Sequence, residues 1–140
     1  MVDLRLELVV VPVTDVDRAK AFYERAGFAV DVDHRAGEHF RVVQLTPPGS
    51  ACSITIGTGL PQAEPGTTQG LHLVVDDLPK ARAELAERGI PVSEPFHFGA
   101  EGQKAGLDPE RRSYGSFAQF EDPDGNSWLL QEVTERSPGR

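Results

Sequence analysis

The sequence YGSFAQFEDPDGNSWLLQ occupies residues 114–131 and contains the clearest turn signal of the chain. Apolar and aromatic residues lead into the segment DPDGN at 122–126, and apolar residues follow it. Pro123 fixes φ, Gly125 accepts a positive φ at no steric cost, and the Asp and Asn side chains can bond nearby backbone amides. The pattern therefore predicts a β-hairpin that turns at 122–126.

Length and charge limit the classes of function. With 140 residues the chain can form one ordinary domain or two small fused units, and its formal net charge of -8 offers no basic surface for nucleic acid or an anionic membrane. The single cysteine, Cys52, excludes an internal disulfide. No segment approaches the roughly 20 apolar residues of a membrane helix, and strand-like alternation opens the chain where a targeting segment would stand. We expect a soluble cytoplasmic protein that binds a small molecule or another protein, with no nucleic acid and no membrane.

Residues 4–57 predict a first module with the order β-α-β-β-β. Asp15 is a suitable helix N-cap, apolar residues recur on one helical face after it, and Gly27 ends the helix. Apolar and β-branched runs predict the four strands around this helix, at 4–13, 28–35, 39–46 and 51–57.

The same pattern returns at a constant offset of 62, which places Asp15 on Asp77 and Gly27 on Gly89. A linker rich in Gly, Pro and Thr, 58–69, separates the first module from a second at 70–134, and 135–140 form a C-terminal tail. The second module has predicted strands at 71–75 and 91–98 and ends in the hairpin. A long loop before the seventh strand, up to Arg112, could close over a binding site as a lid. The prediction is a single α+β domain, 1–140, with eight strands in one cup-like open barrel and the helices outside.

The sequence resembles the vicinal-oxygen-chelate superfamily, which includes glyoxalase I, extradiol dioxygenases and the bleomycin and fosfomycin resistance proteins. The resemblance covers nearly the whole chain and rests on VTDVDRAKAFY at 13–23, GF at 27–28, VDDL at 75–78 and DPDGN at 122–126. These motifs are caps and turns, so they are specific for fold and say little about activity. The resemblance implies two βαβββ modules in a cup-like open barrel, and a homodimer.

Metal-using members of this superfamily carry ligands on the first and last strands of each module. In this chain Leu8, Gly70 and Leu129 occupy three of those positions, and no Asp or Glu occurs between residues 39 and 63. Leucine and glycine side chains have no donor atom for a metal. The resemblance therefore implies a degenerate metal site, and we predict no cofactor. A divalent metal held by shifted ligands is the alternative.

Strand parity points to a second set of residues. Residues two apart on a strand share a face, so His72 accompanies Gly70 and Gln131 accompanies Leu129. This polar pair could orient a carbonyl or hydroxyl of a ligand, and His72 is the candidate catalytic base. The alternative is a hydrogen-bonded histidine with no ligand. The candidate ligand-binding residues are Leu8, Val10, Thr55, His72, His97, Tyr114, Leu129 and Gln131. Trp128 should face the helix, and the side that Gln44 faces is left open.

Three functions follow as hypotheses. The first is a metal-independent pocket that binds a small apolar or aromatic molecule, as in resistance proteins. The second is an enzyme, either a glyoxalase-type lyase or isomerase or a dioxygenase, with relocated ligands. The third is a scaffold that has lost its site and acts through protein contacts. The sequence leaves open whether the protein is an enzyme.

Overall fold

The computed structural model describes residues 1–138 as two compact units, each built from a sheet and one α-helix. Unit one comprises Met1–Thr68 and Asp122–Asn126, and unit two comprises Gln69–Glu121 and the described residues 127–138. The predicted tail, 135–140, ends in residues 139–140, which lie outside the described residues. The α+β class is confirmed, and no helix within residues 1–138 is long and apolar enough to cross a membrane.

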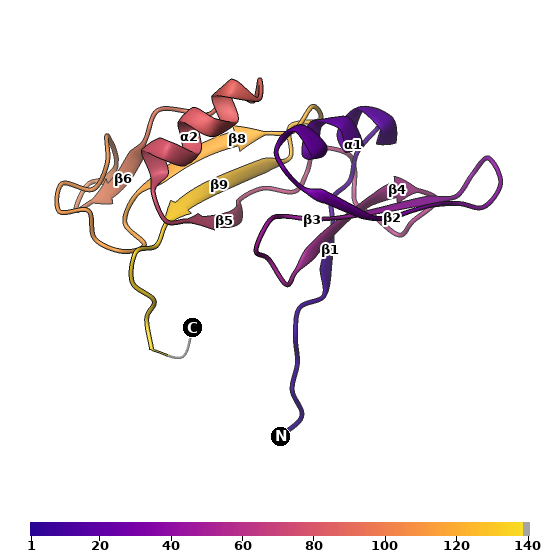
Figure 1. Ribbon diagram of the computed structural model, residues 1–140, viewed down its shortest axis with the longest axis horizontal. Helices are drawn as coiled ribbons and strands as arrows, with labels where there is room; N and C mark the ends of the chain where they lie inside the picture. The colour runs from indigo at the N-terminus through magenta and orange to yellow at the C-terminus, as the bar shows by residue number, and fades with distance from the viewer. Residues whose placement is uncertain (139–140) are drawn as a thin grey trace. The chain divides into compact units, whose positions relative to one another are not determined.

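Unit one has a four-stranded sheet in the order β1-β4-β3-β2, in which β1 is parallel to β4 and the other pairs are antiparallel. Asp15 caps its helix as predicted, because the carboxylate accepts a hydrogen bond from the Arg18 amide at 3.0 Å. Figure 1 shows the helix and strands of this unit in indigo and purple. Its elements are β1 (Leu8–Val10), α1 (Val16–Arg25), β2 (Ala29–Arg35), β3 (Arg41–Thr46) and β4 (Ser53–Thr58).

Unit two has a five-stranded sheet in the order β5-β9-β8-β6-β7, in which only β5 and β9 are parallel among the described strands. The helix lies along β8 and β9 (Figure 1), and Asp77 caps it by accepting from the Lys80 amide at 3.1 Å. The elements are β5 (Leu71–Val75), α2 (Leu78–Glu87), β6 (Phe96–Gly99), β7 (Gly102–Ala105), β8 (Phe117–Glu121) and β9 (Ser127–Glu132).

The number of strands was predicted wrongly. A long loop was expected between the strand predicted at 91–98 and the closing hairpin. Part of this segment instead forms the strand β7, which pairs antiparallel with β6. The described residues therefore contain nine strands where eight were expected. Gly102 closes the turn between them with a φ of 108°, a conformation that glycine adopts without strain. The first strand is also shorter than predicted, because residues 4–7 are exposed and form no part of β1.

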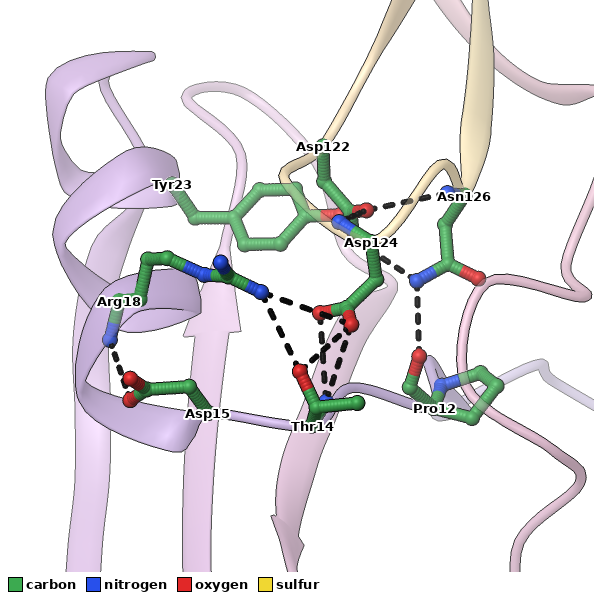
Figure 2. A network of polar contacts seen from close by, with 8 residues as sticks. All are labelled: Pro12, Thr14, Asp15, Arg18, Tyr23, Asp122, Asp124 and Asn126. Carbon is green, nitrogen blue, oxygen red and sulfur yellow. Dashed lines mark hydrogen bonds and ion pairs between the residues drawn. The ribbon is translucent and has the colours of Figure 1, made fainter.

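The hairpin of β8 and β9 is confirmed, with Glu121 opposite Ser127, but its turn is more than a chain reversal. Residues 122–126 pack within unit one, where Asn126 is fully buried. The Asn126 Nδ2 donates to the carbonyl of Pro12 and to Oδ2 of Asp122, each at 2.8 Å (Figure 2). The hydroxyl of Tyr23, on α1, donates to the same Asp122 oxygen at 2.7 Å. The turn is therefore a structural part of unit one.

A second contact of this turn reaches the start of α1. The Thr14 hydroxyl donates to Asp124 at 2.7 Å, and the Thr14 amide lies 3.2 Å from both oxygens of that carboxylate (Figure 2). The amide of Thr68 donates to Oδ1 of Asn126 at 3.0 Å. The side chain of Asn126 thus forms hydrogen bonds with backbone groups more than 50 positions away in the sequence. Buried polar groups need such partners.

Candidate functional site

Six side chains share one face of the sheet in unit two, opposite the face on which α2 packs. The register pairs His72 with Leu129 and Phe117 with Gln131, so each pair projects to the same side. Ring contacts join His72, Phe96 and Phe98 to Phe117. We call this set the aromatic face: His72, Phe96, Phe98, Phe117, Leu129 and Gln131. Trp128 alternates onto the other side, where it is 3 % exposed, as parity predicted.

Phe117 is the centre of the aromatic cluster. Its ring stacks on Phe96 with centroids 5.7 Å apart and meets the edge of Phe98 at 5.4 Å and that of His72 at 6.2 Å. Phe117 is 9 % exposed, whereas Phe98 is 56 % exposed. An apolar ring left this open beside buried rings offers a stacking surface to a ligand.

His72 and Gln131 form the polar part of this face. The His72 Nδ1 lies 2.9 Å from Oε1 of Gln131, and Gln131 Nε2 donates to the backbone carbonyl of Tyr114 at 3.0 Å. The structure therefore brings together the two residues that parity had placed side by side. Tyr114 takes part through its carbonyl, while its hydroxyl accepts from the Ser137 amide at 3.2 Å.

A pocket of about 360 Å³ adjoins the aromatic face and shares Phe96 with it. Its volume lies within the range of small-molecule sites. Backbone and side-chain bonds join its walls, because Ser93 donates its amide to the Gln119 carbonyl and accepts the Gln119 amide on its hydroxyl. The pocket is lined by Ser93, Glu94, Pro95, Phe96, Gln103, Lys104, Ala105 and Gln119.

An ion pair behind the sheet holds the segment that carries Tyr114. The carboxylate of Glu132, which is fully buried, accepts from Nη2 of Arg111 at 2.6 Å and from the Leu78 amide at the start of α2 at 2.8 Å. The bond from Arg111, followed by that from the Leu78 amide, lowers the pKa of Glu132. The Tyr114 amide donates to the Glu132 carbonyl at 2.8 Å, which helps to place the Tyr114 carbonyl beside Gln131.

Sequence reasoning missed Glu132 and its ion pair with Arg111. The available signal was alternation along β9, because Glu132 follows Trp128 and Leu130 at steps of two and so lies on the buried side. Arg111 and Tyr114 also adopt positive φ values, 50° and 72°, which are uncommon for residues other than glycine. Such backbone persists where surrounding contacts enforce it, as the Glu132 contacts do here.

The remaining candidates lie elsewhere. Leu8, Val10 and Thr55 belong to unit one, where Val10 and Gln44 are both paired with Thr55 and share its face of the sheet. The Thr55 hydroxyl is buried and has no hydrogen-bond partner among residues 1–138. In unit two, His97 alternates away from the aromatic face and donates from Nδ1 to the Gly106 carbonyl at 2.8 Å.

The aromatic face carries few metal donors. His72 and Gln131 bond to each other, and the neighbouring Leu129 has no donor atom. Across the part of the chain that the structure describes, no three His, Cys, Asp or Glu side chains are grouped so that they could hold a metal ion.

Comparisons with known proteins agree with the architecture. Residues 5–130 match the family model of the Glyoxalase/Bleomycin resistance protein/Dioxygenase superfamily. TnmS3, an antibiotic binding protein from Streptomyces sp. CB03234, is 33 % identical, with a TM-score of 0.72 over 95 % of this chain and 98 % of its own. A glyoxalase/bleomycin resistance protein from the same organism is 34 % identical, with a TM-score of 0.67 over 91 % of this chain and 100 % of its own. The uncharacterized protein YetH of Bacillus subtilis (strain 168) is 29 % identical over 89 % of this chain and 94 % of its own.

Proposed function

The chain belongs to the Glyoxalase/Bleomycin resistance protein/Dioxygenase superfamily, and on that premise we propose that it binds a small aromatic or apolar molecule on the aromatic face of unit two without a metal. The observation that carries the proposal is Phe98, more than half exposed against the buried ring of Phe117. On the same face Phe117 also contacts His72, which is hydrogen-bonded to Gln131. An aromatic ligand would cover the exposed ring, and a polar group of the ligand would meet the pair.

The similarity to TnmS3 supports this proposal. That protein binds an antibiotic, and the similarity extends over 95 % of this chain at 33 % identity. Fold alone does not transfer function, and the support within this chain is the aromatic face, where apolar rings outnumber ionisable groups. A homodimer and a cytoplasmic location stay predictions made from the sequence.

The first test concerns the metal. Because Leu129 offers no donor and Gln131 is engaged with His72, we expect elemental analysis of protein purified without chelator to find no stoichiometric Fe, Mn, Ni or Zn. Stoichiometric metal that disappears in a His72→Ala variant would overturn the metal-independent proposal and favour the enzyme. The same analysis of a His34→Ala variant, which alters an exposed histidine of unit one, is the control for metal bound at histidines elsewhere.

The second test concerns the stacking surface. Phe98→Ala should weaken binding of 2-naphthol, followed by fluorescence titration, by about twofold to tenfold, the usual contribution of one aromatic contact. Stability should change little, because Phe98 is 56 % exposed. The matched control is Val32→Ala, which removes an apolar side chain of unit one that is 41 % exposed. If both variants bind like the wild type, the aromatic face is not the binding surface. If the wild type binds no aromatic probe, the scaffold hypothesis is favoured.

A further inference from the structure

The hydrogen bonds of Gln131 determine which of its amide atoms faces His72. The Tyr114 carbonyl can only accept, so the Gln131 atom 3.0 Å from it must be the amide nitrogen. The reversed amide would place two oxygens against each other. The amide oxygen therefore points at Nδ1 of His72, 2.9 Å away.

The orientation of the amide in turn selects the tautomer of His72. An amide oxygen can only accept, so Nδ1 of His72 must carry the hydrogen that it donates. A neutral imidazole has one ring hydrogen, and its other nitrogen, Nε2, then bears an exposed lone pair. No hydrogen bond reaches Nε2 from within residues 1–138, and the His72 side chain is exposed. Its only available role toward a ligand in the neutral state is that of acceptor.

We propose that the ligand is a hydroxylated aromatic molecule, whose O–H donates to Nε2 of His72 while its ring lies against Phe98 and Phe117. This inference rests on the proposed function and narrows its ligand class. The Tyr114 carbonyl, the Gln131 amide and the imidazole form one chain of donors and acceptors, so the acceptor is set before the ligand arrives. His72 and Gln131 lie on adjacent strands, β5 and β9, and the turn before β8 supplies the Tyr114 carbonyl that orients the Gln131 amide.

The test compares two probes that share a ring system and differ in one hydrogen-bond donor. 2-Naphthol has a hydroxyl group, whereas in 2-methoxynaphthalene a methyl group replaces the hydroxyl hydrogen and makes the molecule more apolar. At neutral pH the wild type should bind 2-naphthol about threefold to tenfold more tightly, the usual effect of one hydrogen bond. His72→Ala should remove this preference, and the control His34→Ala should keep it.

The probe comparison distinguishes failure of the ligand class from failure of the proposed function. If the wild type binds both probes equally, or if the preference for 2-naphthol survives in His72→Ala, the ligand class proposed here is wrong and the aromatic binding site still stands. If neither probe binds to the wild type, the proposed function fails and the ligand class fails with it.

The tautomer can be measured without any ligand. Long-range ¹H–¹⁵N correlation spectra of the wild type, recorded at a pH where the imidazole is neutral, should show a protonated Nδ1 and a bare Nε2 for His72. The signal is assigned by its loss in His72→Ala, and the four histidines of the chain keep the spectrum simple. Gln131→Ala should shift the ring toward a mixture of tautomers. A protonated Nε2 in the wild type would overturn the inference even if the alanine variants fold poorly.

Discussion

Asn126→Asp should destabilise the protein by about 3 kcal/mol or more, because it replaces a buried donor with a carboxylate oxygen. The Asn126 Nδ2 lies 2.8 Å from both the Pro12 carbonyl and the Asp122 carboxylate, and in the variant three oxygens would meet there. Asn126→Ala avoids the repulsion but leaves the Pro12 carbonyl and the Thr68 amide without this partner, so we expect a loss of about 2 kcal/mol. Urea denaturation followed by the fluorescence of Trp128 measures both values.

Glu121→Gln is the matched control for these variants. Glu121 is exposed and immediately precedes the turn, so exchanging its carboxylate for an amide should change the free energy of unfolding by no more than about 0.5 kcal/mol. If Asn126→Asp unfolds at the same urea concentration as Glu121→Gln, the turn does not stabilise unit one as described.

Glu132→Ala should cost about 3 kcal/mol in the free energy of unfolding, since it removes one partner of a pair whose carboxylate is buried. The variant leaves Arg111 and the Leu78 amide without their shared acceptor and creates a cavity beneath the sheet of unit two. Glu87→Ala, on the exposed side of α2, is the control and should be close to neutral. Equal urea midpoints for the two variants would contradict the structural role of Glu132.

The cost of Glu132→Ala should depend on pH. The pKa of Glu132 is lowered in the folded protein, so its charge stabilises the fold above the unfolded pKa, and this contribution is lost as pH falls through the folded pKa. The difference between wild type and variant should therefore be largest near pH 7 and shrink in acid. A difference that stays constant from neutral to acid pH would show that packing, with no share from the charge, accounts for the effect.

Features set by neighbouring residues were predicted well. Asp15 and Asp77 both cap their helices, and the β8–β9 hairpin turns at the predicted residues, because a cap or turn depends on only a few adjacent positions. The strand β7 was missed because Gly102, Gln103 and Lys104 are also typical of a loop. It forms through pairing with β6, which local composition does not encode.

In the candidate site, too, some contacts could be predicted from local sequence and others depend on which strands pair. Parity was enough to place His72 beside Gln131, because both lie on strands with a period of two. The contacts of Phe117 with Phe96 and Phe98 depend on which strands pair across the sheet, so sequence alone did not indicate them. The same reason applies to the Tyr114 carbonyl, which reaches Gln131 only in the folded unit.

The turn at 122–126 also determines when unit one can finish folding. When residues 1–68 have been translated, the helix and every described strand of this unit have been synthesised. Asn126, which donates to the Pro12 carbonyl and accepts from the Thr68 amide, lies 58 residues beyond Thr68. Residues 1–68 must therefore wait for residues 122–126 before unit one is complete, and contacts over such separations slow folding. Premature termination anywhere before Asn126 would leave unit one without this turn.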